Sequence, residues 1–130
     1  MGAVFGKTKR NLLLSSDIVL LPTYLSETFP TIILESYKYG TPVVSYYFRG
    51  VKEIVIDGKT GVIIRRPSYI ELAKTISKFI THRYMLRLMG LNALNYVNNF
   101  CTEYVIPQII KLYIHEIYKA IKKGREYGFN

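Results

Sequence analysis

The sequence has 130 residues, of which 49% are hydrophobic and 21% are charged. This composition excludes a disordered polypeptide and is typical of a globular chain long enough to bury a core. The formal net charge is +9, yet the chain has no run of about five like charges. A solvated basic surface is therefore the favoured interpretation, and a nucleic acid is the less favoured partner.

The cysteine content and the hydropathy bear on the compartment. Cys101 is the single cysteine, so an internal disulfide cannot form, which is typical of a reducing compartment. No apolar run approaches the length of a membrane span, and the N-terminus lacks a signal-peptide core. His82 and His115 stand apart from metal-ligand spacing, so no metal site is expected. We predict a cytoplasmic protein without a transmembrane segment.

The first part of the chain predicts alternating strands and helices. Residues 3–5 are a short strand candidate. Thr8 can cap a helix that runs to about Ser15, with the leucines at 12–14 on its inward face. Residues 18–21 are an unbroken apolar run, which suits a parallel strand covered on both faces.

A short helix, a strand and one further turn of helix are expected next. Pro30 suits the first helical position, because the N–H missing there would have no partner anyway. Gly40 suits the left-handed residue that closes a helix, and Pro42 prevents its continuation. Residues 43–46 predict a buried strand, and residues 51–56 predict one turn of helix.

The last strand and the helical region follow a turn at residues 57–61. The strand is expected at 62–64, and from Pro67 onward the pattern is helical. Ser68 and Glu71 form a capping box. The second and third helices are expected over about residues 84–100 and 106–123. The inward stripes of the three helices are Leu72, Ile76, Phe79 and Ile80; Leu88, Leu91, Leu94 and Val97; and Ile110, Tyr113, Ile114, Ile117 and Ile121.

This order of elements predicts an α/β fold, in which a partial Rossmann-like parallel sheet is flanked by helices. We expect one domain over residues 1–130. Its α/β part would span residues 1–66 and carry the site. Residues 67–130 would form a helical C-terminal region that ends in a tail helix.

Two carboxylates flank the start of the short helix. Glu27 lies in the loop at 26–28, and Glu35 lies inside the helix, about 7–8 Å beyond Pro30 along its axis. The amides of residues 28–31 between them suit an anion or a sugar hydroxyl. The structural alternative is that Glu27 only stabilises the helix dipole, by a few tenths to about 1 kcal/mol, and that Glu35 is an exposed helix acid.

Three blocks of the sequence, in this order and spacing, are more specific than the glutamate pair alone. They are residues 16–23, then Glu27 and Glu35 with residues 40–44, and finally residues 50–62. This arrangement resembles retaining glycosyltransferases of family four, which have the GT-B fold. The resemblance extends over about residues 4–100.

The resemblance implies specific roles for the glutamate segment. Glu27 would lie against the donor sugar as the catalytic-site residue, and Glu35 would hold the ribose hydroxyls of the nucleotide. The amides of Thr28 and Phe29 would contact sugar or phosphate oxygens. The substrate-binding residues are then Glu27, Thr28, Phe29, Pro30, Thr31 and Glu35. The nucleotide-sugar donor would be a substrate, and neither a cofactor nor a bound metal is implied.

The sequence also departs from the family pattern. Arg49 stands where the family usually has a glycine, and Tyr37 stands where a smaller residue is common, which affects the expected shape of the pocket. Family members have two domains, roughly 350–400 residues, so the chain corresponds to a truncated C-terminal, donor-binding domain. The basic pair that holds the diphosphate would precede Ala3. We therefore expect weak binding of a nucleoside diphosphate and no sugar transfer by these residues alone.

Two other functions stay open at this point. One is a basic module that binds a nucleotide or nucleic acid without transfer, and the other is a structural interaction subunit. A sheet edge beginning at Ala3 and the apolar stripe of the tail helix predict a homodimer or a complex with a missing partner chain. The alternative is a tail helix that folds back onto its own sheet.

Overall fold

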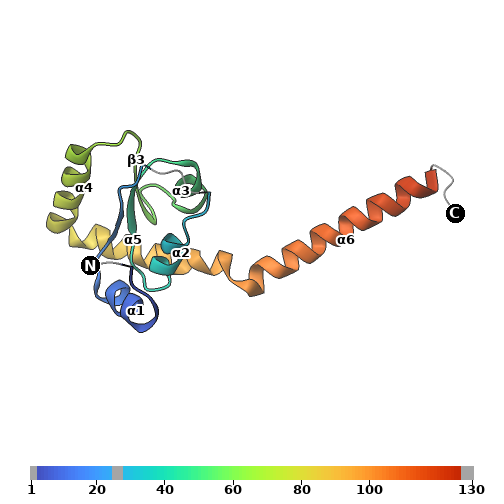
Figure 1. Ribbon diagram of the computed structural model, residues 1–130, viewed down its shortest axis with the longest axis horizontal. Helices are drawn as coiled ribbons and strands as arrows, with labels where there is room; N and C mark the ends of the chain where they lie inside the picture. Colours follow the sequence, from blue (N-terminus) through green and yellow to red (C-terminus); the bar gives the residue numbers. More distant parts are fainter. Residues whose placement is uncertain (1–2, 25–27, 127–130) are drawn as a thin grey trace. The chain divides into compact units, whose positions relative to one another are not determined.

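The computed structural model describes residues 3–24 and 28–126. Its contacts divide the chain into two compact units, Met1–Val97 and Asn98–Asn130. The first unit contains, in chain order, α1 (Gly6–Ser15), β1 (Val19–Leu21), α2 (Thr31–Tyr37), β2 (Val43–Tyr46), α3 (Arg49–Ile54), β3 (Gly61–Ile64), α4 (Tyr69–Thr81) and α5 (Arg83–Tyr96) (Figure 1). A 3-10 helix at Val97–Phe100 leads to α6 (Thr102–Glu126).

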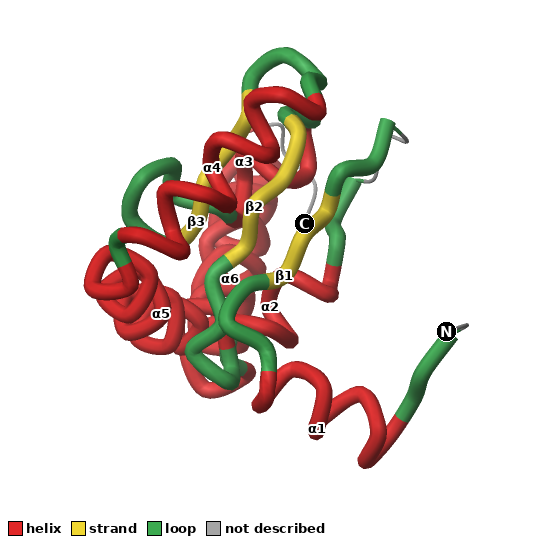
Figure 2. Tube along the Cα trace, turned by 90° about the vertical axis from the view of Figure 1, so that its left-hand side faces the viewer, coloured by secondary structure: helices red, strands yellow, loops and turns green. Residues whose placement is uncertain are grey.

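The three described strands form one parallel sheet in the order β1-β2-β3. Figure 2 shows them side by side in yellow. Val43 of β2 lies opposite Val19 of β1 and opposite Gly61 of β3. All four residues of β2 are buried, as expected for a central parallel strand covered on both faces. The predicted α/β class, with a partial Rossmann-like sheet, is confirmed.

The N-terminal end of the chain differs from the prediction. Residues 3–5 form no strand; they lead directly into α1, which begins at Gly6 rather than after Thr8. Gly6 has a φ of 56°, a left-handed conformation that glycine adopts without a side-chain clash. Ala3 and Phe5 are exposed and Val4 is half-buried, so little burial holds this short segment in a sheet. Within residues 12–14, only Leu13 is buried.

Helix α2 is ended by its own backbone, as the sequence predicted. Gly40 has a φ of 68°, and its N–H donates to the Tyr37 carbonyl at 3.0 Å. The Thr41 N–H donates to the Ser36 carbonyl at 3.1 Å, which completes a Schellman motif. The prediction for the other end was wrong by one position. Pro30 is the flanking residue with a ψ of 95°, and Thr31 is the first helical residue.

The core on one side of the sheet is built from β2, β3, α4 and α5. Its buried members are Val44, Tyr46, Ile64, Phe79, Leu86 and Met89. The predicted cap of α4 is confirmed, since the Ser68 hydroxyl accepts a hydrogen bond from the Glu71 N–H at 3.3 Å. The inward stripe of α4 was partly wrong, because Ile80 is 66% exposed whereas Phe79 is buried.

The inward face of α5 is not the predicted leucine stripe. Leu88, Leu91 and Leu94 are 47%, 60% and 42% exposed. The buried positions of the helix are Leu86, Met89, Gly90 and Ala93. A Cβ atom on Gly90 would come within 2.3 Å of the Gly40 carbonyl oxygen, so the two backbones are in direct contact. Close packing of α5 on the end of α2 therefore requires the small residues of α5 to face inward.

The second unit contains the 25-residue helix α6. This helix begins at Thr102, before the predicted start, and holds Pro107 inside it. The end of the predicted second helix is instead the 3-10 turn at Val97–Phe100. The stripe residues Ile110 and Ile117 of α6 are 52% and 57% exposed, since a single helix cannot bury its own apolar face. Among the described residues, no helix has both the length and the hydropathy needed to cross a bilayer.

Candidate functional site

The predicted site lies where the chain leaves the carboxyl end of β1 and enters α2. In open parallel sheets, this edge is where ligands bind. Leu25, Ser26 and Glu27 lie outside the described residues, so the assignment of Glu27 as the catalytic-site residue stays a prediction. The described part of the segment resumes at Thr28 and reaches α2 at Thr31.

The segment between Thr28 and Thr31 combines exposed and buried residues. Thr28 and Thr31 are exposed, and Phe29 is 49% exposed. Pro30 is fully buried, and its carbonyl accepts a hydrogen bond from the Ile33 N–H at 3.1 Å. Pro30 thus anchors the backbone of a segment whose other described side chains face solvent. Contacts of its amides with a ligand stay a prediction.

Glu35 is held by an ion pair that the sequence did not predict. Its side chain is 40% exposed, but the Oε2 atom is buried, with less than 1 Å² accessible. The Lys9 Nζ atom of α1 forms an ion pair with this Oε2. Lys9 itself is 32% exposed. Glu35 is therefore a half-buried carboxylate with a fixed partner rather than a freely solvated helix acid.

A hollow of about 170 Å³ lies beside this ion pair, between α1 and the end of α2. It is lined by Gly6, Lys9, Arg10, Leu13, Glu35, Lys38 and Tyr39. Three cationic side chains thus surround one carboxylate. Sites that enclose a whole drug-sized ligand measure about 300–1,000 Å³, so this hollow is too small to enclose such a ligand.

Aromatic side chains gather at the carboxyl ends of β1 and β2. The rings of Tyr24 and Tyr46 have centroids 5.6 Å apart and an interplanar angle of 55°. Tyr46 belongs to the core, whereas Tyr24 and Tyr47 are 79% and 50% exposed. The Ser45 hydroxyl donates to the Leu21 carbonyl at 3.0 Å and ties the two strand ends together. Tyr24 and Tyr47 are therefore the tyrosines at this edge that a ligand can reach.

Tyr37 lies behind the site, in the core. Its side chain is fully buried, and its hydroxyl is 2.8 Å from the Thr60 hydroxyl. Thr60 Oγ1 also accepts the Ile56 N–H at 2.9 Å. Burial raises the pKa of the Tyr37 phenol to about 12, although the hydrogen bond to Thr60 acts in the opposite direction. Tyr37 is absent from the lining of the hollow beside Glu35, so its bulk does not narrow that hollow.

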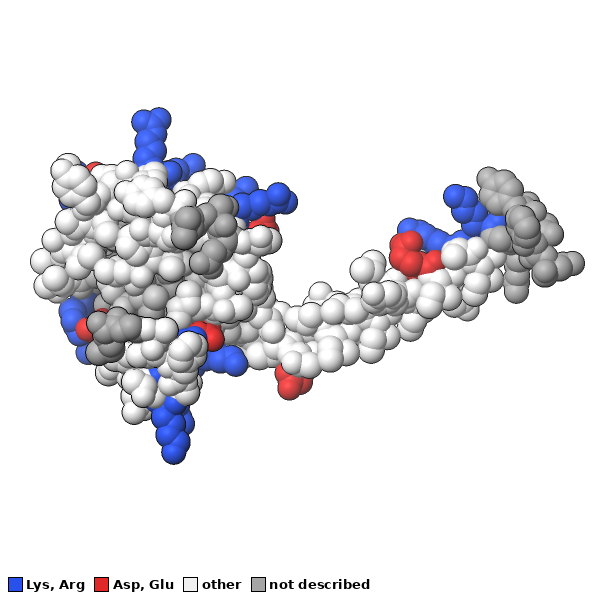
Figure 3. Space-filling model, in the orientation of Figure 1, with Lys and Arg blue, Asp and Glu red and all other residues white. Residues whose placement is uncertain are grey.

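Other surfaces of the described chain offer weaker candidates. A hollow of about 430 Å³ is lined by Tyr47, Lys52, Val55, Asp57, Ile63 and Arg65, but the Asp57 carboxylate already accepts the Ile63 N–H at 2.9 Å. Within the described ranges, no group of three potential metal ligands occurs. On the face of the first unit shown in Figure 3, Lys and Arg are scattered rather than gathered in one patch, so no nucleic-acid surface stands out there.

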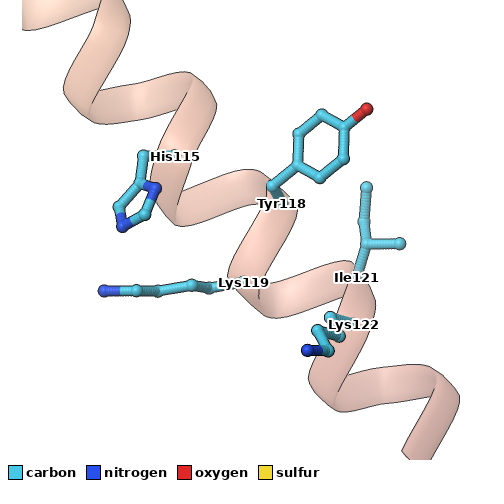
Figure 4. Close-up of a pocket in the computed structure, with 5 residues that line it drawn as sticks. All are labelled: His115, Tyr118, Lys119, Ile121 and Lys122. Carbon is cyan, nitrogen blue, oxygen red and sulfur yellow. The ribbon is translucent and has the colours of Figure 1, made fainter.

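A further hollow lies along α6 alone. It is lined by His115, Tyr118, Lys119, Ile121 and Lys122. In Figure 4, His115 and Lys119 point to one side of the helix, and Tyr118 and Ile121 point to another. Side chains that diverge from a single helix do not enclose a ligand, so this hollow is part of an uncovered helix surface.

Comparison with known proteins identifies the family. Residues 2–95 match the family described as glycosyl transferases group 1. The match covers well over half of the chain, so the chain belongs to this family. The resemblance to GT-B glycosyltransferases that the sequence indicated is thereby confirmed.

Individual relatives are much longer than this chain. D-inositol 3-phosphate glycosyltransferase from Nocardia farcinica is 29% identical over 99 residues, which are 76% of this chain and 22% of the relative. The structure of HepE from Anabaena in complex with UDP-glucose has a TM-score of 0.73 at 24% identity, over 86% of this chain and 31% of HepE. Sucrose-phosphate synthase from Thermosynechococcus elongatus has a TM-score of 0.77 at 23% identity, over 92% and 30%. The chain thus spans between about a fifth and a third of these proteins.

Lys9 is a residue of the candidate site that the sequence analysis did not single out. It is one of several cations near the start of the chain, and nothing in its local pattern sets it apart from Lys7 or Arg10. Only the packing of α1 beside α2 brings it to Glu35.

Proposed function

We propose that this chain binds a nucleotide-sugar donor as part of a retaining glycosyltransferase. The observation that carries the proposal is the Glu35 carboxylate, held half-exposed on α2 in a member of the glycosyl transferases group 1 family. The fold neighbour HepE was solved with UDP-glucose, which supports a nucleotide-sugar as the ligand class. This chain spans only part of the length of its relatives. We therefore propose sugar transfer for the whole protein and not for these residues alone.

The proposed contacts follow from the chemistry of the side chains. An ionised carboxylate accepts hydrogen bonds only, so Glu35 suits a pair of ribose hydroxyls. The exposed segment at Thr28 and Phe29 would contact oxygens of the sugar or of the phosphates, and Glu27 would lie against the donor sugar. Oriented in this way, a donor would lie along α2 with its ribose at Glu35 and its sugar toward the loop before Thr28.

A nuclear magnetic resonance titration of the 130-residue polypeptide with UDP and UDP-glucose tests the proposal. We expect saturable shifts centred on α2. Glu35→Gln should weaken binding about 10–100-fold, because a hydrogen bond to a charged group contributes about 1.5–3 kcal/mol, and about 1.4 kcal/mol corresponds to a factor of ten. The method is suited to the weak affinity expected of these residues alone.

Glu71→Gln is the matched control. Glu71 is an exposed carboxylate on α4 with its own lysine partner, the Lys74 ammonium at 3.0 Å. Its replacement should leave nucleotide binding unchanged. Duplex and single-stranded DNA serve as competitors and should not displace the nucleotide. Binding that is indifferent to Glu35→Gln would contradict the proposal.

We also propose that α6 mediates self-association through its apolar stripe. Glu103 lies in the first turn of the helix, and Lys119, Lys122 and Lys123 lie toward its other end. Two copies packed antiparallel would bring Glu103 of each copy toward Lys122 and Lys123 of the other while covering both stripes; Lys119 already pairs with Glu116 at 3.2 Å. A second copy of this chain is therefore the partner we propose.

The single cysteine supports a reducing compartment such as the cytoplasm.

A further inference from the structure

The ion pair between Lys9 and Glu35 involves one oxygen of the carboxylate, and this bears on ligand binding. The Glu35 side chain is 40% exposed, yet its Oε2 atom has less than 1 Å² accessible and is the atom paired with Lys9. The exposure of Glu35 therefore belongs to the rest of its side chain. One carboxylate oxygen is committed to the protein, and the remaining part of the side chain faces outward.

We infer that Lys9 is a positioning residue, which holds Glu35 by Oε2 so that the rest of its carboxylate is presented to ribose hydroxyls. This inference rests on the proposed function, because it assigns to Lys9 a role in the same nucleotide site. Lys9 acts on nucleotide binding only through Glu35 and does not touch the nucleotide itself. It keeps the carboxylate oriented before the ligand arrives, so that binding does not have to order a mobile side chain.

The placement of α1 makes this role structurally sound. Lys9 can orient Glu35 only if α1 is itself fixed relative to α2. The side chain of Leu13 on α1 is buried, and its carbonyl accepts a hydrogen bond from the Thr41 hydroxyl at 3.0 Å. Thr41 is the last residue of the Schellman motif that ends α2. The two helices are thus joined at this point by a buried hydrogen bond.

The neighbouring cations differ from Lys9 in their surroundings. Arg10 and Lys38 line the same hollow but are exposed. In the described part of the chain, the ion pair of Glu35 is with Lys9. Lys7 lies on the same helix, is exposed and does not line the hollow. Lys7→Met therefore makes the same chemical change as Lys9→Met without touching the pair.

The affinities of uridine and UDP for six proteins test the inference: wild type, Lys7→Met, Lys9→Met, Lys9→Arg, Glu35→Gln and the double variant Lys9→Met with Glu35→Gln. We expect Lys9→Met to weaken the binding of uridine and of UDP by the same factor, about 3–10-fold, because binding must then order the Glu35 side chain. Lys9→Arg should restore most of the affinity, and Lys7→Met should change nothing. In the Glu35→Gln background, Lys9→Met should have no further effect, because its action passes through Glu35.

Several results would overturn the inference. A loss that is larger for UDP than for uridine would show that Lys9 contacts the phosphates directly. An increase in affinity would show that Lys9 competes with the ribose. A lower melting temperature with unchanged affinity, or an undiminished effect in the Glu35→Gln background, would assign Lys9 a role independent of ligand positioning.

The same measurements separate this inference from the proposed function. If Glu35→Gln weakens binding and Lys9→Met does not, only the role of Lys9 is wrong. If Glu35→Gln has no effect, or if neither uridine nor UDP binds, the nucleotide site at Glu35 is wrong and the role of Lys9 fails with it.

Discussion

Tyr37 places a phenol in the interior of the first unit, two residues along α2 from Glu35. The side chain is fully buried, its hydroxyl meets the Thr60 hydroxyl at 2.8 Å, and burial raises its pKa to about 12 from a usual value of 10.0. The folded state therefore holds the phenolic proton more tightly than the unfolded state. The protonated Tyr37 phenol therefore makes its full contribution to the free energy of unfolding below about pH 10. This contribution is lost as the pH rises from about 10 to about 12.

Replacement of Tyr37 by phenylalanine tests this pH dependence. At neutral pH, Tyr37→Phe should lower the free energy of unfolding by about 1 kcal/mol, because the hydrogen bond to Thr60 is lost. Between pH 10 and pH 12 the wild type should lose about 2–3 kcal/mol relative to the variant, since one pKa unit corresponds to about 1.36 kcal/mol. Urea unfolding of both proteins at a series of pH values measures this difference. The other tyrosines are the same in both proteins, so the effect of their titration cancels.

Tyr113→Phe is the control for this series, because Tyr113 is 66% exposed on α6. Its unfolding free energy should follow that of the wild type across the same range. Parallel curves for the wild type and Tyr37→Phe above pH 10 would contradict the role assigned to the buried phenol.

At the scale of elements, α5 shows that an apolar stripe and a buried face can differ. Met89 is 6% exposed and belongs to the core beside β2 and β3, whereas Leu91 is 60% exposed. Gly90 meets the Gly40 backbone, and this close approach determines which side of the helix faces inward. Helix periodicity alone cannot reveal such a contact, because leucine is the more usual inward residue.

Two alanine substitutions on α5 test which face is buried. Met89→Ala should lower the free energy of unfolding by about 2–5 kcal/mol, through lost burial and the cavity that remains. Leu91→Ala should change it by no more than about 0.5 kcal/mol, as is usual for exposed positions. Chemical denaturation of both variants measures the two values. Equal losses, or a larger loss for Leu91→Ala, would show that α5 packs on its leucine stripe.

At the scale of the whole molecule, the arrangement of the sheet changes one expectation about association. No strand begins at Ala3, so the predicted N-terminal sheet edge does not exist; β1 and β3 are the edges of the described sheet. The stripe on α6 is present, and Ile114 and Ile117 on it are 54% and 57% exposed. The self-association that we propose therefore involves α6 rather than a strand at the N-terminus.

Light scattering over a dilution series tests self-association through α6. We expect the wild-type chain to dissociate from dimer to monomer on dilution, and the double variant Ile114→Asp with Ile117→Asp to be monomeric throughout, because charges would be buried in the apolar interface. Leu112→Asp is the matched control. Leu112 is also exposed, at 61%, but at about 100° per residue it lies on the opposite side of the helix.

The control variant should still dimerise. A wild-type chain that is monomeric at every concentration would contradict the proposal that a second copy is the partner. Loss of dimer in Leu112→Asp as well as in the double variant would show that α6 associates without a preferred face.

The sequence by itself determined the features that depend on neighbouring residues. The left-handed Gly40, the cap at Ser68 and the buried strand at β2 follow from backbone conformation, hydrogen bonds and hydropathy within a few positions. Three sequence blocks, one of which holds the glutamate pair, also indicated the family of the chain, as the match over residues 2–95 confirms.

Only the tertiary structure decided which residues meet across elements. Lys9 reaches Glu35 because α1 packs beside α2, and the buried face of α5 follows from the contact of Gly90 with Gly40. Such pairings depend on how rigid helices fit together, and the same local sequence is compatible with several fits. Local hydrogen bonds and dihedral preferences can be predicted from sequence, whereas contacts between distant elements arise only when the whole unit is packed.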